Sequence, residues 1–149
     1  MAKKKPLWTC PRCGHRFVTQ NLWHSCGHYS LNDHFVNKDP LVRELFDALT
    51  KQIRRYGPVT IYAQKTRIVF QVRVRFVSVT SRKRWLDCTV WLKRRADHPL
   101  LRRLEFLPPY NYIHHFRLTE KVQIDQIEPL FHESYAIGCQ EDLGSPSVK

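Results

Sequence analysis

The chain has 149 residues, of which 42% are hydrophobic, and its 25 Lys and Arg against 13 Asp and Glu give a formal net charge of +12. This length suffices for one well-buried core with a small appendage but not for two full domains, and the apolar content excludes global disorder. The positive charge does not determine a fold, but it predicts a polyanionic partner such as nucleic acid.

The sequence shows no sign of membrane insertion or export. No run approaches the ~18 apolar residues of a membrane-spanning helix. Residues 1–6 carry the positive charge of a signal-peptide start, but no apolar stretch follows them. Three of the five cysteines fall within the first 26 residues, which favours metal binding in a reducing compartment over a disulfide framework. We therefore expect a soluble, cytoplasmic protein.

The first predicted element is a metal-binding turn in which Cys10 and Cys13 are separated by two residues and followed by Gly14. Thiolates at this spacing can both reach one Zn²⁺ at about 2.3 Å, while glycine lets the backbone turn away without a Cβ clash. Ordinary buried thiols or a redox dithiol are the alternative, but a redox C-x-x-C motif occurs in a βαβ setting that this sequence lacks. The spacing therefore predicts a structural zinc site.

The second pair of zinc ligands follows within 25 residues of the first pair. His24 and His28 are four residues apart, as on one face of a helix, but Gly27 weakens a continuous helix. Cys26 is the softer ligand, and it can share an ion with His24 if the helix ends at Gly27. We predict a tetrahedral set of four ligands, with His34 as first substitute and His28 as second: Cys10, Cys13, His24 and Cys26.

A short helical turn at 30–33 and a domain boundary near 37–39 should separate this finger-like segment, residues 1–38, from the rest of the chain. Asp39 and Pro40 have the residue types of an N-cap and first helical position, and Gly57-Pro58 ends the helix. The apolar residues between them follow the 3.6-residue period: Val42, Leu45, Phe46, Leu49 and Ile53.

Two alternating strands should follow. From 65 to 76 apolar residues point one way, and mostly basic residues, among them Arg67, Arg73 and Arg75, point the other way. A turn at 80–84 leads to a second strand over 85–93, in which Trp85 and Trp91 share the outward side with Asp87, Thr89 and Lys93. The two strands should pair as a hairpin whose basic face is uncovered.

The remaining elements are a loop at 94–99, a short strand at 103–106, a turn at 108–111 and a strand at 112–118. A last helix should begin with Asp125 as N-cap and Glu128 at N3, and end at Gly138, with Pro129 near its first turn. Residues 39–140 would form the core domain and 141–149 a flexible tail. The predicted fold class is α+β: a zinc finger followed by four or five antiparallel strands with both helices on one face.

These residues resemble a family of uncharacterised bacterial proteins that join a zinc-finger-like start to the domain of unknown function 5655. The resemblance implies a single α+β unit from near Asp39, and it carries no established activity. It includes both His24-x-Cys26 and His34, so it leaves the ligand choice open. The motifs that carry it span nearly the whole chain: Trp8-x-Cys10-Pro11-x-Cys13-Gly14, Phe17, His24-Ser25-Cys26, Asp33-His34, Val42-Arg43-x-Leu45-Phe46, Gly57-Pro58-Val59, Lys65-Thr66-Arg67-Ile68, Arg94-Arg95, His115-Phe116-Arg117 and Tyr135-x-x-Gly138.

Nucleic-acid association is the first functional hypothesis. Cations that alternate with flat aromatic side chains suit a groove that follows a phosphate backbone and stacks bases. The alternative is that this face binds no ligand and is a solvated sheet face whose arginine stems cover the strands. The residues predicted to contact nucleic acid, DNA or RNA, are Arg67, Arg73, Arg75, Arg82, Lys83, Arg84, Trp85, Trp91, Lys93 and Arg117.

Two other functions remain open. Arg67, Arg73 and Arg117 could converge on a small anionic ligand beside the tryptophans, or this face could bind a protein partner. An enzyme would need an acid–base pair from His114 or His115 with Glu105, but adjacent strand residues face opposite sides, so at most one histidine can take part. No phosphate loop, nucleophile elbow or paired carboxylates occur in the sequence, so the sequence favours a non-catalytic protein and leaves an enzyme as the third hypothesis.

Overall fold

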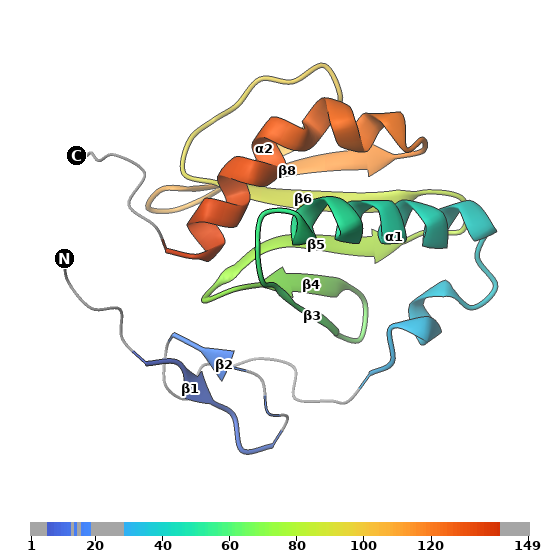
Figure 1. Ribbon diagram of the computed structural model, residues 1–149. Coiled ribbons are helices and arrows are strands. Elements are labelled where there is room, and N and C mark those ends of the chain that lie inside the picture. The colour runs from blue at the N-terminus through green and yellow to red at the C-terminus, as the bar shows by residue number, and fades with distance from the viewer. Residues whose placement is uncertain (1–5, 13, 15, 19–28, 141–149) are drawn as a thin grey trace.

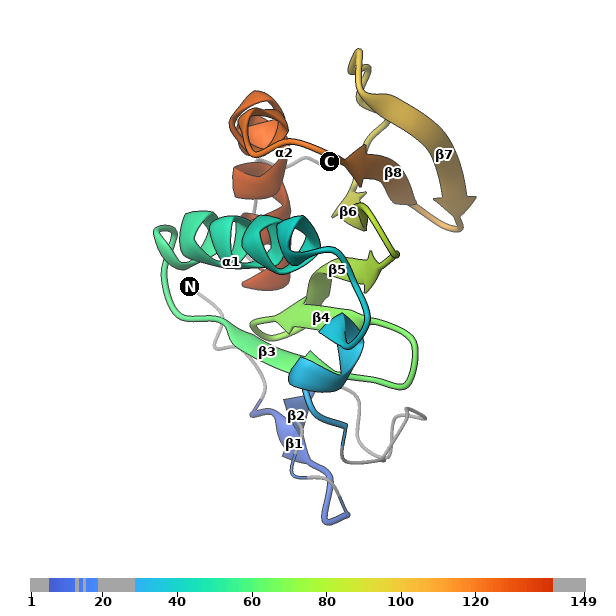
Figure 2. The ribbon, with the colours of Figure 1, turned by 90° about the vertical axis from the view of Figure 1, so that its right-hand side faces the viewer.

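The computed structural model describes residues 6–12, 14, 16–18 and 29–140. Its main part is a six-stranded antiparallel sheet in the order β3-β4-β5-β6-β8-β7, and two helices, α1 and α2, cover one face of it (Figures 1 and 2). A separate two-stranded sheet precedes this unit. In chain order the elements are β1 (Trp8–Thr9), β2 (Arg16–Phe17), a 3₁₀ helix η1 (Asn32–Phe35), α1 (Pro40–Arg54), β3 (Thr60–Ala63), β4 (Ile68–Gln71), β5 (Arg75–Ser81), β6 (Leu86–Leu92), β7 (Leu101–Leu107), β8 (Asn111–Leu118) and α2 (Val122–Gly138).

This architecture confirms the α+β class and the antiparallel sheet, but the predicted number of four or five strands is wrong. One additional strand is β3, whose four residues are too few for alternation to stand out in the sequence. The other arises because β4 and β5 replace the single strand predicted over 65–76. Among the described helices, none combines the length and the apolar character needed to cross a membrane.

Helix α1 begins as predicted. The Asp39 side chain accepts a hydrogen bond from the backbone N–H of Leu41 at 2.9 Å, and Pro40 occupies the first turn, where no intrahelical N–H is needed. The five apolar residues at helical spacing are all buried: Val42, Leu45, Phe46, Leu49 and Ile53. Helix η1 packs against α1, since the Phe35 and Phe46 rings lie 5.2 Å apart.

The prediction of one continuous strand over 65–76 is wrong. The chain turns at 72–74, so β4 ends at Gln71 and β5 begins at Arg75, with a register irregularity at Phe70/Gln71. The backbone N–H groups of Arg73 and Val74 donate to the carbonyl of Gly138, at 2.8 and 3.1 Å. Beside one longer bond within the turn, from the Val72 N–H to the Val74 carbonyl at 3.3 Å, the turn is therefore closed by the end of α2, a partner that the local sequence pattern does not contain.

The second predicted strand is confirmed, but its predicted partner is wrong, because β6 pairs with residues 77–81 and not with the predicted first strand over 65–76. Strand β6 pairs antiparallel with β5 across the turn at 82–85. Along β6 buried and half-buried residues alternate without exception, so one set of side chains packs under the helices: Leu86, Cys88, Val90 and Leu92. The intervening Asp87, Thr89 and Trp91 face the other way.

After β6 the chain crosses to the edge of the sheet. A loop over 93–100 leads to β7, and β8 then returns between β7 and β6. The predicted strands at 103–106 and 112–118 are confirmed, and both are longer than predicted. This order places β8 beside β6 and leaves β7 at the edge (Figure 2).

Helix α2 ends at Gly138 as predicted, but it begins at Val122, before the predicted N-cap Asp125. The Gln123 side chain stabilises the start of the helix, because its Oε1 accepts hydrogen bonds from the backbone N–H groups of Thr119 and Glu120, at 2.7 and 3.1 Å. Pro129 consequently lies inside the helix rather than in its first turn.

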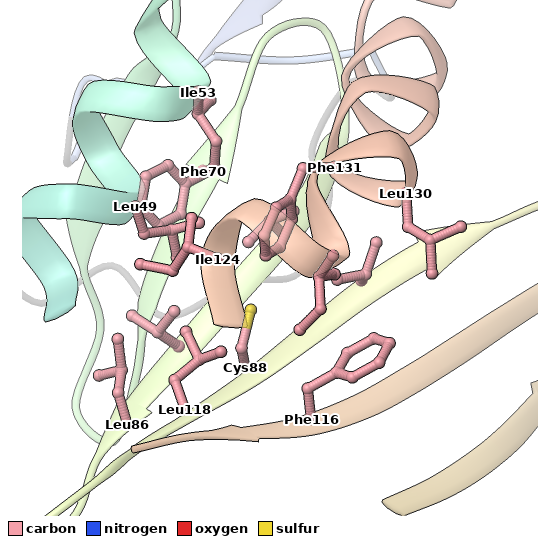
Figure 3. Packing of buried hydrophobic residues seen from close by; sticks show 14 of the residues in the cluster. Leu49, Ile53, Phe70, Leu86, Cys88, Phe116, Leu118, Ile124, Leu130 and Phe131 are labelled. Atoms are coloured by element: carbon pink, nitrogen blue, oxygen red, sulfur yellow. The ribbon is translucent and has the colours of Figure 1, made fainter. Parts of the chain in front are cut away.

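The core lies between the sheet and the two helices (Figure 3). Phe70, Phe116 and Phe131 are fully buried there, and each such side chain contributes about 1.5–3 kcal/mol through removal of apolar surface from water. Cys88 lies among them, and burial raises the pKa of its thiol. Cys88 therefore acts as a small apolar core residue rather than as a reactive thiolate.

Candidate nucleic-acid interface

The face of the six-stranded sheet away from α1 and α2, called the outer face below, carries polar and aromatic side chains of β6 and β8. The register of these two strands sets Asp87 opposite Arg117, Thr89 opposite His115, and Trp91 opposite Ile113. Because these residues alternate with buried core residues, they share one side of the sheet. Long side chains from neighbouring strands can therefore meet there.

Four residues at one end of the outer face form what is called the Asp87 cluster below. The Arg117 guanidinium lies over the Trp85 ring, 4.3 Å from its centroid. Trp85 Nε1 donates to Asp87 Oδ1 at 3.0 Å, and Arg82 Nε donates to Asp87 Oδ2 at 2.8 Å. Arg117 Nε lies 3.8 Å from Asp87 Oδ1. One carboxylate thus orients an indole and two guanidinium groups, which leaves a net positive charge.

The other end of the same strand face carries a second cation and ring. Lys93 Nζ lies 4.2 Å from the centroid of the Tyr110 ring and 3.2 Å from Asn111 Oδ1. Burial lowers the pKa of Lys93. Trp91, two residues earlier on β6, lies between this pair and the Asp87 cluster along the strand. The outer face of β6 therefore presents a cation and an indole or phenol at both ends, as the alternation predicts.

The two adjacent histidines of β8 face opposite sides of the sheet. His115 Nε2 lies 3.1 Å from Glu105 Oε1 and 3.2 Å from a terminal guanidinium nitrogen of Arg103, on the outer face. His114 is fully buried on the helix side: its Nδ1–H donates to the Tyr112 carbonyl at 3.1 Å, and its Nε2 accepts from the Ala96 backbone N–H at 3.0 Å. Only His115 pairs with Glu105, as expected for neighbours on a strand.

The arginines of the β4–β5 hairpin have different neighbours from those of β6 and β8. Arg67 Nε donates to Gln64 Oε1 at 2.8 Å, and burial, with the nearby charge of Arg75, lowers the pKa of Arg67. Arg73, in the turn between β4 and β5, donates through Nε to Gln140 Oε1 at 2.8 Å. Arg67, Arg73 and Arg117 thus have different partners, and their convergence on a small anionic ligand stays a prediction. The tip of the β5–β6 hairpin is exposed at Arg82, Lys83 and Arg84.

The N-terminal hairpin, β1 and β2, contacts the sheet at its β3–β4 end. Gln71 Nε2 donates to the Arg16 carbonyl. The Arg75 guanidinium lies 5.9 Å from the centroid of the Phe17 ring. In both ribbon views β1 and β2 lie on the β3 side of the molecule, away from β6–β8 (Figures 1 and 2). The described part of this hairpin therefore leaves the β6–β8 half of the outer face uncovered.

Of the four predicted zinc ligands, Cys10 is the one that the structure describes; Cys13, His24 and Cys26, with the substitute His28, lie outside the described residues. Cys10 is buried, and its carbonyl accepts a hydrogen bond from the Gly14 N–H at 2.8 Å. Gly14 has φ +77°, which glycine adopts without strain, as the turn prediction requires.

The substitute ligand His34 has another partner, because its Nε2 lies 2.7 Å from the Gln64 carbonyl. Within the part of the chain that the structure describes, no group of three or more His, Cys, Asp or Glu side chains could hold a metal ion. The zinc prediction thus depends on residues beyond this part.

Sequence reasoning placed Asp87 on the outer face but gave it no role. Arg82 and Trp85 reach Asp87 from within the same hairpin, whereas the approach of Arg117 to Asp87 depends on the pairing of β6 with β8, which are separated in the sequence by β7. Alternation reveals which side a residue faces but not which residue of another strand lies opposite. The one signal for this role in the sequence is a carboxylate that can accept hydrogen bonds, placed among basic residues.

Comparison with known proteins identifies a family and no characterised relative. No curated protein and no solved structure matches the chain. The family described as "Domain of unknown function (DUF5655)" matches residues 31–138, from just before η1 to the last residue of α2. This match covers well over half of the chain and includes every strand of the six-stranded sheet. The chain therefore belongs to the DUF5655 family.

Proposed function

We propose that this protein binds nucleic acid through the outer face of β6 and β8, beside an N-terminal segment stabilised by zinc. The observation that carries the proposal is the Arg117 guanidinium stacked 4.3 Å from the Trp85 ring centroid. Flat aromatic and guanidinium surfaces of this kind stack on bases, and each stacked base contributes about 1–3 kcal/mol to binding.

The surroundings of this stack support the proposal. Trp91 and Lys93 continue the same face along β6, and Arg82, Lys83 and Arg84 extend it at the hairpin tip. Asp87 holds Arg82 and Trp85 through hydrogen bonds of 2.8 and 3.0 Å, so part of the side-chain ordering is complete before a ligand arrives. A formal net charge of +12 attracts a phosphate backbone over longer distances.

Zinc would be held by Cys10, Cys13, His24 and Cys26, and it would supply a structural crosslink rather than a reactive centre. The buried Cys10 and the left-handed Gly14 that closes its turn support this part of the proposal. Thiolate ligands persist in a reducing environment, so we propose a cytoplasmic location. Exchange of Cys10 and Cys13 for Ser should unfold the N-terminal segment while the six-stranded sheet persists, as amide protection in hydrogen exchange would show.

The test of nucleic-acid binding is purification of the full chain under native conditions, followed by metal analysis and by titration with fluorescent single-stranded DNA and RNA. We expect about one zinc per chain and an affinity whose logarithm falls with log salt by about 0.7 for each phosphate neutralised. Binding that does not change with salt, or no binding of either strand at low salt, would overturn the nucleic-acid proposal. Less than a tenth of an equivalent of zinc would overturn the metal proposal.

A further inference from the structure

A groove opens where β7 begins and β8 ends, next to the outer face. Its volume is about 470 Å³. One wall comes from the start of β7 and the loop before it, at Pro99, Leu100, Leu101 and Arg102, and the other comes from Arg117, Thr119 and Gln123. Arg117 belongs to both sites, because it lines this groove and also stacks on Trp85. The groove therefore continues the outer face rather than standing apart from it.

The polar groups of the groove are mostly hydrogen-bond donors. Gln123 Oε1 accepts hydrogen bonds from the Thr119 N–H at 2.7 Å, the Glu120 N–H at 3.1 Å and the Thr119 hydroxyl at 3.3 Å. This fixes the orientation of the amide, because its NH₂ group cannot face these donors. The Nε2 group of Gln123 is then left to donate to a ligand.

The two arginines add positive charge that is not fully neutralised. Arg117 Nε is buried without a hydrogen-bond partner among the described residues, and Asp87 Oδ1 lies 3.8 Å from it. Arg102 is exposed on the edge strand, at the register irregularity between Leu101 and Arg103. None of the residues that line the groove is acidic. Two guanidinium groups and an amide donor, with no carboxylate among the lining residues, favour an anion in the groove.

We propose that this groove binds a phosphate group, held by Arg102, Arg117 and the Gln123 side-chain amide. Guanidinium groups bind phosphate oxygens through paired hydrogen bonds, and an amide donor adds a further contact. The volume exceeds that of a phosphate group alone, and Pro99, Leu100 and Leu101 give an apolar wall for the organic part of the ligand. The identity of the molecule that contains this phosphate group rests on the proposed function. It is a nucleic-acid strand whose neighbouring bases stack at Trp85.

The test uses Arg102→Glu, which reverses an exposed charge in the groove, and Arg54→Glu as its matched control. Arg54 is also exposed, but it lies at the end of α1, on the covered side of the sheet. Inorganic phosphate, a nucleoside monophosphate and a single-stranded oligonucleotide are each titrated into the full chain. In NMR spectra the Nε–H resonance of Arg117 reports both sites, whereas the side-chain NH₂ resonances of Gln123 report the groove, because Gln123 lines the groove and is not part of the Asp87 cluster.

We expect all three ligands to shift the Gln123 resonances in the wild type and in Arg54→Glu, and not in Arg102→Glu. Oligonucleotide affinity should fall about tenfold more for Arg102→Glu than for Arg54→Glu at low salt, with a salt slope smaller by about 0.7. If oligonucleotides bind equally to both variants and shift the Arg117 resonance and the Trp85 indole resonance but not those of Gln123, the groove proposal fails and the proposed function stands. If phosphate and the monophosphate shift the Gln123 resonances but no oligonucleotide binds, the groove stands and the proposed function fails. No response to any ligand overturns both.

Discussion

The two hairpins that share β5 are closed in different ways. In the β4–β5 hairpin the N–H groups of Arg73 and Val74 donate to the carbonyl of Gly138, at the far end of the chain. In the β5–β6 hairpin Arg82 N–H donates to the carbonyl of Trp85 at 2.9 Å, within the turn itself. A turn closed by its own residues leaves a local signature in the sequence, whereas one closed by a distant helix end does not.

The same difference separates the arginines of the two hairpins. Arg73 donates to Gln140, just beyond α2, and Arg75 lies beside the Phe17 ring of β2, so both are occupied by other parts of the chain. Arg82 and Arg117 share one carboxylate and an indole on a half-exposed strand face. We infer that the β4–β5 arginines are mainly structural, and that the arginines of the Asp87 cluster bind ligands.

The largest effect on stability should come from disturbing the contact between the end of α2 and the β4–β5 turn. A Cβ added at Gly138 would overlap the Phe76 ring, which is fully buried and also contacts Tyr135. Gly138→Ala should therefore lower the free energy of unfolding by about 1–3 kcal/mol, measured by urea denaturation. Because Gly138 also closes the β4–β5 turn, amide protection at 73–74 should be lost before that of β6.

A double variant separates overlap at Phe76 from an effect on the helix. Phe76→Leu alone should destabilise by creating space, but in the Gly138→Ala background its cost should shrink, since the smaller side chain accommodates the new methyl group. Strictly additive losses in the free energy of unfolding would show that the close approach of Gly138 to Phe76 is not the reason why position 138 requires glycine.

The second prediction concerns binding. Arg82→Glu with Lys93→Glu reverses two charges at the two ends of β6, and Arg73→Glu with Arg75→Glu reverses two charges on the β4–β5 hairpin. The two pairs change the net charge equally, so a difference between them measures position alone. We expect the first pair to weaken oligonucleotide binding about tenfold more than the second, a difference of about 1.4 kcal/mol.

The two pairs of substitutions should affect stability in the opposite order to their effects on binding. Arg73 and Arg75 contact Gln140 and Phe17, so their exchange should lower the melting temperature more than that of the β6 pair. Equal losses of binding for the two pairs would indicate a diffuse charge effect, and a larger loss for Arg73 and Arg75 would place the interface on the other hairpin.

The features that the sequence predicted are those controlled by neighbours in sequence. The Asp39 cap, the apolar stripe of α1 and the alternation along β6 each depend on residues a few positions apart, and each is confirmed. The break at 72–74 depends on Gly138, and the Asp87 cluster depends on the insertion of β8 beside β6. Contacts of this kind are set by topology, which local periodicity does not specify.

The loop after β6 is held by a side chain, the imidazole of His114, and disturbing this contact should have the smallest effect on stability. The Ala96 N–H donates to Nε2 of His114, which must be neutral to accept. Burial lowers the pKa of His114 from its ordinary value of 6.5, aided by the charge of Arg94, while hydrogen bonds to backbone carbonyls and the charge of Glu133 oppose this shift. The unfolded chain thus binds a proton at a pH where the folded chain does not, so stability from this residue falls as pH drops below about 6.5.

Replacing this histidine should flatten that dependence. In the wild type we expect His114 to contribute a loss of less than about 1 kcal/mol in the free energy of unfolding between pH 7 and pH 6. His114→Gln keeps an acceptor for the Ala96 N–H but does not titrate, so urea denaturation should show a shallower fall over this range. An imidazole resonance of His114 that titrates at or above 6.5, or an unchanged slope in the variant, would show that protonation of His114 does not release the loop. If the prediction is correct, acid should expose the amide of Ala96 to exchange before those of the Arg82–Trp85 turn, whose closure involves no titrating group.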